Sequence, residues 1–183
     1  MSNMQLDTLR RIVQEINASV SLHDSLDIMV NHVAEAMHVD VCSIYLLDER
    51  NKRYVLMASK GLKPEAVGHV SLNVGEGLVG LVGKREEIVN LDNAPKHERF
   101  AYLPETGEEL FNSFLGVPVM YRRKVMGVLV VQNQEPQDFS EAAESFLVTL
   151  CAQLSGVIAH AHAVGNIDVF RKPTSGSSYK TFQ

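Results

Sequence analysis

Hydrophobic residues recur at helical spacing near the start of the chain. Apolar side chains three or four positions apart predict a first helix over residues 4–19. A second apolar stripe extends over 22–37, and Ser21 followed by Asp24 is typical of a helix N-cap. Both helices are amphipathic, so each must bury its apolar stripe against another layer of structure.

The middle of the chain changes to the short alternating segments that are typical of strands. Segments 41–48 and 53–59 flank the polar turn DERNK, which predicts an antiparallel hairpin. Successive side chains of the first strand point to opposite faces, and one of these faces is wholly apolar. We expect that face to pack on the helices. The other face carries Ser43 and Tyr45 and is the better candidate for a ligand cavity.

Two shorter strands are predicted over 69–74 and 87–91, on either side of a glycine-rich segment and a short helix. A second hairpin follows, with arms at 113–121 and 125–132 joined by the basic turn RRK. Its second arm is almost continuously apolar, which indicates a central strand buried on both faces.

Two further residues mark the ends of predicted elements in the last part of the chain. Pro118 cannot donate to a strand ladder, so it predicts a bulge or an edge in the first arm of the second hairpin. Ser140 is a suitable N-cap for a final amphipathic helix of about 25 residues.

The glycine-rich segment NVGEGLVGLVGK resembles a phosphate-binding loop. Gly75, Gly77 and Gly80 fit the pattern G-x-G-x-x-G, but a dinucleotide fold needs parallel βαβ units and an acidic residue about 20 positions later. Asp92 comes too early and an antiparallel hairpin follows. The P-loop pattern also fails, because Arg85 follows Lys84. We expect the glycines instead to let a helix begin abruptly beside the sheet and to bring backbone close to a small molecule.

Residues 93–112 form a long polar connection, which is usually functional or mobile. It is either a lid over a pocket or a surface loop. The domain is predicted to cover 4–164, and the polar segment 165–183 to be a linker to an absent C-terminal part. A natural flexible tail is the alternative for that segment.

Composition limits the classes of function. The chain has 183 residues and a net charge of −5, typical of one soluble domain and unlike a nucleic-acid-binding surface. We expect no membrane span and no signal peptide, and therefore a cytoplasmic protein. Cys42 and Cys151 lie in apolar surroundings and are expected to be buried structural thiols.

An enzyme should bring several titratable side chains together in one place, and the sequence shows no such cluster of side chains. The 7 histidines are scattered, and no cysteine–histidine spacing suggests a metal site. We therefore expect a non-catalytic module with no cofactor and no metal.

Three segments carry a family resemblance: SIYLLDE at 43–49, VGEGLVGLVG at 74–83 and LGVPVMYRRKVMGVLVVQ at 115–132. Over residues 4–164 the chain resembles a GAF domain. The fold that this resemblance implies is α+β, with a central antiparallel sheet of about six strands. The N- and C-terminal helices would pack on one face, and a loop and a short helix would cover a pocket on the other.

Within this family, the amino-acid sequence is most similar to the N-terminal GAF domain of the nitrogen-related phosphotransferase-system enzyme I. Matching segments include VCSIYL, LMASKGL and ESFLVTLCAQL. The resemblance implies a parent protein that phosphorylates itself on a histidine from phosphoenolpyruvate and passes the phosphate to a small carrier protein. It also implies a sensor of nitrogen status, with glutamine or 2-oxoglutarate as the ligand.

Other GAF classes fit less well. The free methionine-(R)-sulfoxide reductases use clustered cysteines, whereas Cys42 and Cys151 are expected in the core, away from a pocket. The chromophore-bearing class needs a cysteine in the pocket half. A cyclic-nucleotide type has no convincing signature here, although it is harder to exclude.

An amino-acid ligand needs an anion for its ammonium group and a cation or backbone N–H groups for its carboxylate. Glu76 or Asp92, with Arg99 and the amides near Gly77, would meet both needs. The candidate ligand-binding residues are Ser43, Tyr45, Asn73, Glu76, Gly77, Asn90, Asp92, Arg99, Phe100, Tyr102, Met120 and Asn133. The alternative is a structural dimerisation module with an empty or vestigial pocket, forming a homodimer through its terminal helices.

Overall fold

A computed structural model describes residues 3–101, 104–106 and 111–164 of the chain. Its helices are α1 (Asn3–Ala18), α2 (Leu22–Met37), α3 (Gly77–Arg85) and α4 (Glu141–Ala163). Its strands are β1 (Val41–Asp48), β2 (Arg53–Lys60), β3 (Ser71–Asn73), β4 (Val89–Leu91), β5 (Ser113–Tyr121) and β6 (Lys124–Asn133). Short 3₁₀ turns lie at Pro64–Ala66, Ala94–Lys96 and Pro104–Thr106. The predicted linker 165–183 lies outside the described residues.

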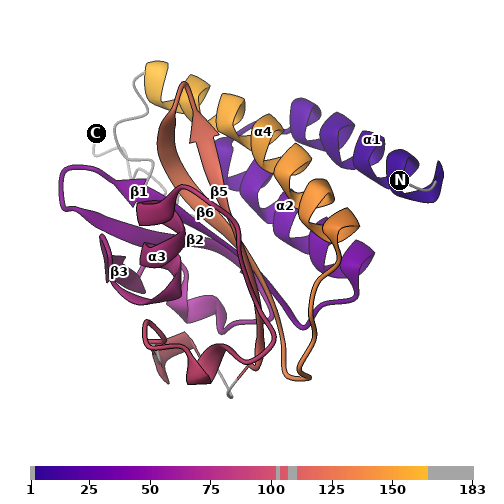
Figure 1. Cartoon of the computed structure of the whole chain (residues 1–183). Helices are drawn as coiled ribbons and strands as arrows, with labels where there is room; N and C mark the ends of the chain where they lie inside the picture. The colour runs from indigo at the N-terminus through magenta and orange to yellow at the C-terminus, as the bar shows by residue number, and fades with distance from the viewer. Residues whose placement is uncertain (1–2, 102–103, 107–110, 165–183) are drawn as a thin grey trace, which may run out of the picture.

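The strands form one antiparallel sheet in the order β3-β2-β1-β6-β5-β4. Both predicted hairpins are present, and β6 lies between β1 and β5 as its apolar sequence indicated. The predicted α+β fold, with six strands and helices on one face, is confirmed (Figure 1).

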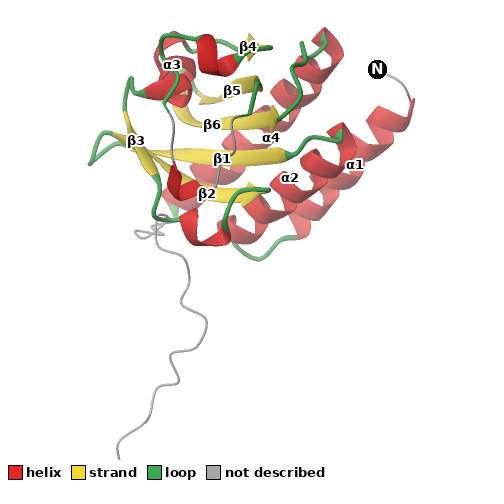
Figure 2. Cartoon of the chain, turned by 90° about the horizontal axis from the view of Figure 1, so that it is seen from below, coloured by secondary structure: helices red, strands yellow, loops and turns green. Residues whose placement is uncertain are grey.

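The sheet separates two hydrophobic cores. Helices α2 and α4 pack directly on one face, and α1 lies across both of them (Figure 2). The short helix α3 covers the opposite face. The alternation in β1 follows this division as predicted: Cys42, Ile44 and Leu46 lie in the helix-side core, and Tyr45 lies in the core under α3.

Both predicted N-caps are present. Ser21 Oγ accepts a hydrogen bond from the Asp24 N–H at 3.1 Å, and Ser140 Oγ accepts one from the Ala143 N–H at 3.2 Å. Each cap satisfies one of the N–H groups that the first turn of a helix leaves without a partner. The serines therefore determine where α2 and α4 begin.

Helix α4 is long and apolar enough, by length and composition, to cross a membrane. From the sequence we expected no membrane span, because polar residues interrupt every continuous apolar run. In the fold, α4 packs on β5, and Leu147, Leu150 and Leu154 are completely buried. One such helix is weak evidence for a membrane span, because a core helix can pass the same test.

The predicted strand boundaries differ most at the short strands. The structure restricts 69–74 to Ser71–Asn73 and 87–91 to Val89–Leu91. Gly75 has a positive φ and Glu86 ends α3 in the left-handed conformation, so turns occupy the residues beside each strand. Pro118 lies beyond the end of the β4–β5 ladder, one residue before a bulge at Val119–Met120. Both features predicted from Pro118 are therefore present.

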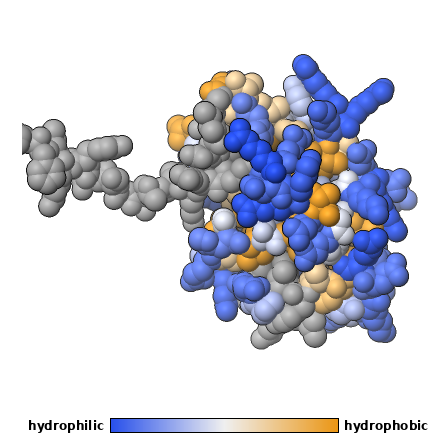
Figure 3. All heavy atoms as spheres, turned by 90° about the vertical axis from the view of Figure 1, so that its left-hand side faces the viewer, coloured by the Kyte–Doolittle hydropathy of each residue, from blue (hydrophilic) through white to orange (hydrophobic). Residues whose placement is uncertain are grey.

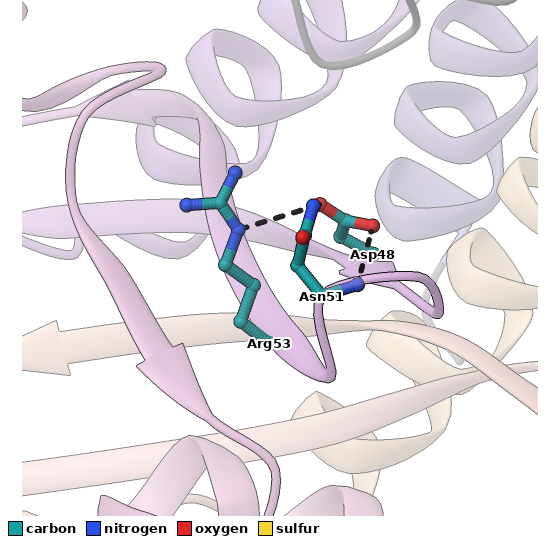
Figure 4. A network of polar contacts seen from close by, with 3 residues as sticks. All are labelled: Asp48, Asn51 and Arg53. Carbon is teal, nitrogen blue, oxygen red and sulfur yellow. Dashed lines mark hydrogen bonds and ion pairs between the residues drawn. The ribbon is translucent and has the colours of Figure 1, made fainter.

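A carboxylate organises the turn between β1 and β2 (Figure 4). Asp48 accepts hydrogen bonds from the backbone N–H of Asn51 at 3.2 Å and from its side-chain amide at 2.7 Å. The Arg53 Nε donates to the same carboxylate at 3.3 Å. Burial opposes ionisation of Asp48, but the bonds from Asn51 and Arg53 outweigh it and lower the pKa of the carboxyl below its usual value.

Candidate functional site

A small cavity lies between the sheet and α3, on the face that the sequence assigned to a pocket. Its volume is about 30 Å³. Its walls come from β1, β3, β5, β6, α3 and the segment before residue 102. The lining residues are Tyr45, Leu72, Gly77, Leu78, Val79, Phe100, Ala101, Phe114, Val130 and Gln132.

The N-terminus of α3 forms one wall of this cavity. Gly77, Leu78 and Val79 are all buried, and the N-cap residue Glu76 makes no side-chain capping bond. Among the described residues, none accepts a hydrogen bond from the N–H groups of Gly77, Leu78 or Val79; the first N–H in the helix with a partner is that of Gly80, bonded to Glu76 O at 3.0 Å. Such a helix end favours an acceptor with negative charge.

Close packing explains two of the glycines in α3. A Cβ at Gly80 would lie 2.6 Å from the carbonyl carbon of Gly75, and one at Gly83 would lie 1.9 Å from the Tyr54 hydroxyl oxygen. These glycines therefore bring the helix close to the protein itself. Only Gly77 of the helix glycines lines the cavity. Burial, together with the nearby Glu86, raises the pKa of Tyr54.

Gln132 is the polar side chain of the opposite wall. It lies in β6 between Val41 of β1 and Phe114 of β5, and only 9% of its surface is exposed. No hydrogen bond joins its amide to another described residue, and because no buried side-chain N or O of these residues lacks a partner, the amide remains accessible to solvent. Apart from Gln132 and Tyr45, the side chains that line the cavity are apolar.

The segment 97–101 covers the cavity. Phe100 is half-buried and lines the cavity, and its N–H donates to His97 O at 3.0 Å. The Arg99 Nη1 donates to Gly75 O at 3.1 Å, which ties the segment to the turn before α3. The ends of the 93–112 connection are also joined, because the Ala94 N–H donates to Asn112 O at 2.6 Å.

The side of the molecule on which α3 and β3 lie in Figure 1 shows mostly hydrophilic residues, with small separate hydrophobic areas (Figure 3). Among the described residues, no group of three or more His, Cys, Asp or Glu side chains could hold a metal ion.

The family model of the GAF domain matches residues 21–158 of the chain. The chain belongs to the GAF domain family. The match extends from the N-cap of α2 into the last turns of α4 and includes every strand of the sheet.

Relatives of this GAF domain occur in phosphotransferases. The chain is 41% identical, over 91% of its length, to a protein named "Phosphoenolpyruvate-dependent phosphotransferase system" from Salmonella typhimurium, and it spans 22% of that protein. It is 84% identical to the GAF domain of an Acinetobacter phosphoenolpyruvate-protein phosphotransferase, with a TM-score of 0.83 over 91% of this chain and 99% of that one. The GAF domain of the Coxiella burnetii phosphoenolpyruvate-protein phosphotransferase is 44% identical, with a TM-score of 0.86 over 90% and 99% of the two chains.

Three of the predicted ligand-binding residues line the cavity of this GAF domain: Tyr45, Gly77 and Phe100. Four more lie near the covering segment or the start of α3. Glu76 accepts a hydrogen bond from the Asn73 N–H at 2.8 Å, so its carboxylate closes the turn from β3. The Arg99 side chain donates a hydrogen bond to Gly75 O. Asp92 directly follows β4, and its side chain is exposed.

Four of the remaining predicted residues lie elsewhere. Asn90 Nδ2 donates to Phe139 O at 2.8 Å and to Glu144 Oε1 at 2.9 Å, which joins β4 to the start of α4. Asn133 Oδ1 accepts from the Asp40 N–H at 2.8 Å. Ser43 Oγ lies 2.9 Å from Ser59 Oγ, and Met120 lies near the hairpin turn. None of these four lines the cavity. Tyr102 lies outside the described residues.

Sequence reasoning missed Gln132, whereas the amides near Gly77 were among the groups predicted to bind a carboxylate. A signal for Gln132 was available, because it follows the apolar Val128 and Val130 at a spacing of two and therefore lies on the same face of β6.

Both cysteines of the GAF domain are free and buried in the helix-side core, as predicted. Burial raises the pKa of both thiols, and the nearby Cys151 raises that of Cys42 further. A thiol must ionise to act as a nucleophile, so these cysteines are unsuited to redox chemistry at the cavity, which lies across the sheet.

Proposed function

We propose that this GAF domain is a non-catalytic sensor that binds a nitrogen metabolite, glutamine or 2-oxoglutarate, in the cavity between the sheet and α3. The observation that carries the proposal is the start of α3, where Gly77, Leu78 and Val79 are buried and line that cavity, and where their N–H groups have no acceptor among the described residues. A carboxylate, which both metabolites have, is the group that such a helix end binds best.

We propose that the protein containing this GAF domain is a cytoplasmic phosphoenolpyruvate-dependent phosphotransferase. Support comes from the identity of the chain to the GAF domains of the Acinetobacter and Coxiella phosphotransferases. The phosphohistidine chemistry and the carrier protein would belong to the part of the parent outside this chain. The GAF domain would then report nitrogen status to that part.

Calorimetric titration of the 183-residue chain with each metabolite tests this function. Ala101→Leu is the blocking variant, because Ala101 lines the cavity and lies beside Gly77. Ala142→Leu on the exposed side of α4 is the matched control. Saturable binding that is lost only in Ala101→Leu supports the proposal, and the absence of binding of both metabolites contradicts it.

The second candidate is a dimerisation module with a vestigial pocket. The small volume of the cavity favours it, as do exposed apolar residues on the terminal helices: Met4 is 79% exposed and Leu6 48% exposed on α1, and Val148 is 44% exposed on α4. Sedimentation of Leu6→Asp and Val148→Asp variants tests it. A dimer that both variants dissociate, without metabolite binding to the parent chain, would favour this function over sensing.

A further inference from the structure

The turn between β5 and β6 holds two arginines in a strained backbone conformation. Tyr121 pairs with Lys124, so Arg122 and Arg123 form a two-residue turn, and their φ angles are 48° and 65°. A residue with a Cβ adopts this left-handed conformation at a cost in free energy, and Asn-Gly is the sequence that such a turn prefers. The arginines therefore make the turn less stable than a better-suited sequence would.

The turn between β1 and β2 has the same feature, because Lys52 in this turn has a φ of 53°. Two other non-glycine residues of the described chain have a positive φ, His38 and Glu86. Each of these ends a helix, where the left-handed conformation is common. Lys52, Arg122 and Arg123 have no such explanation.

The two turns lie at the same end of the sheet. Strands β1 and β6 are adjacent and antiparallel, with Leu46 opposite Gly127, so β1 enters its turn at the end of the sheet where β6 leaves its own. The middles of the two turns are two strand spacings apart, or about 10 Å. That separation fits within one interface of standard size, which covers roughly 800 Å² on each partner.

We call residues 49–52 and 122–124 the basic turns, because their charge is opposite to that of the whole chain. All of these residues are described, and their exposed basic members are Arg50, Lys52, Arg122, Arg123 and Lys124. Glu49 is their one acidic residue, and the carboxylate of the adjoining Asp48 is already bonded to Asn51 and Arg53 (Figure 4). The chain has a net charge of −5, so positive charge is concentrated here against an overall excess of negative charge.

The fold makes little use of these basic side chains. No other described residue forms an ion pair or a hydrogen bond with the side chain of any of the five. The Arg122 guanidinium lies over the Tyr121 ring, 5.3 Å from its centroid. Stacking of this kind orients a guanidinium and leaves its N–H groups free to bind an acceptor.

The residue types in the basic turns distinguish between classes of anionic partner. Arginine and tyrosine often anchor protein–protein interfaces, and a guanidinium pairs with a carboxylate through two hydrogen bonds. A nucleic acid or a membrane would extend beyond the basic turns over the rest of the domain, whose excess of negative charge repels it. An acidic protein surface can contact the basic turns alone and avoid that repulsion.

We propose that the basic turns are a docking site for an acidic surface of a partner protein. Arg122 and Arg123 bind carboxylates of the partner, and the other basic residues of the turns add positive charge around them. The strained turn presents both arginines beyond the end of the sheet, as strained backbone commonly does at binding sites. None of these residues lines the cavity beside α3, so this site goes beyond the proposed sensing function.

Fluorescence anisotropy with a labelled decaglutamate peptide tests the inference. The 183-residue chain should bind this probe saturably, and Arg122→Asn with Arg123→Gly should weaken binding at least about tenfold. Because Asn-Gly suits the turn, this variant should have a Tm equal to or above that of the parent chain, which excludes unfolding as the cause. Arg122→Gln with Arg123→Gln should weaken binding to the same extent.

Lys60→Gln with Lys63→Gln is the matched control, because it removes the same charge from exposed residues at the opposite end of β2. It should change the affinity for decaglutamate by less than about twofold. Equal weakening by this control, or no saturable binding to the parent chain, would overturn the inference. Tighter binding of decathymidylate, or of vesicles of phosphatidylserine and phosphatidylcholine, would also overturn it and assign the basic turns to a nucleic acid or a membrane. Calorimetry with glutamine should give the same result for every variant, so the sensing function is tested separately.

Discussion

The Tyr54 hydroxyl of β2 lies against Gly83 of α3, at a point where a Cβ would stand 1.9 Å from the hydroxyl oxygen. Tyr54 is 2% exposed, and its strand pairs with β1 on one side and β3 on the other. Neither the Tyr54 side chain nor the backbone of Gly83 can therefore move away from this contact easily. This contact therefore sets how closely α3 approaches the sheet and, with it, the size of the cavity beside the helix.

Gly83→Ala should destabilise the domain by about 1–3 kcal/mol, because the added methyl group overpacks the contact with Tyr54. Urea unfolding of the 183-residue chain measures this change. Gly156→Ala in α4 is the matched control: nothing lies within 4 Å of its added Cβ, and alanine there should stabilise the helix by about 0.5–1 kcal/mol. Equal effects of the two variants would contradict the packing role of Gly83.

Asp48→Asn should destabilise the domain by about 1–2 kcal/mol at pH 7, because hydrogen bonds from Asn51 and Arg53 favour the ionised carboxylate. The folded pKa of Asp48 lies below its unfolded value of about 3.9, so this stabilisation is complete above that pH and is lost as the pH falls through the folded pKa. The difference in free energy of unfolding between parent and variant should therefore shrink below about pH 4. A difference that stays constant from pH 7 to pH 2 would show that ionisation of Asp48 is not its cause.

Substitutions in the Arg122–Arg123 turn between β5 and β6 should stabilise the domain. Both arginines have positive φ, 48° and 65°, as in the two-residue turns for which Asn-Gly is the preferred sequence. Arg122→Asn with Arg123→Gly should raise the free energy of unfolding by about 1–2 kcal/mol. The double glutamine variant removes the same charges and should give no such gain. If both double variants stabilise equally, charge and not backbone conformation is responsible.

Asn90→Ala should destabilise the domain by about 1–3 kcal/mol, because it leaves groups at the start of α4 without their bonds. Metabolite affinity should not change, since Asn90 does not line the cavity. Asn31→Ala, which removes an exposed bond to Asp27 O on α2, is the control and should have a smaller effect. A selective loss of binding in Asn90→Ala without loss of stability would restore the ligand-binding role predicted from the sequence.

The periodicity of apolar residues and the capping residues of the helices predicted most of this fold from the sequence. The apolar stripes of α1, α2 and α4, the alternation in β1 and the caps at Ser21 and Ser140 are decided by residues close together in the chain. Such sequence patterns predict the structure reliably because side chains point in regular directions along helices and strands. They led to the right sheet and to the right helix face.

Tertiary structure decided which polar residues meet at the cavity between the sheet and α3. Asn90 and Gln132 are both polar residues of otherwise apolar strands, yet one joins β4 to α4 and the other lines the cavity. The difference depends on the β3-β2-β1-β6-β5-β4 order and on the close approach of α3, which pairs residues tens of positions apart. Hydrogen bonds need their two atoms within a few tenths of an ångström of an optimal distance, and sequence spacing does not define positions across the fold that finely.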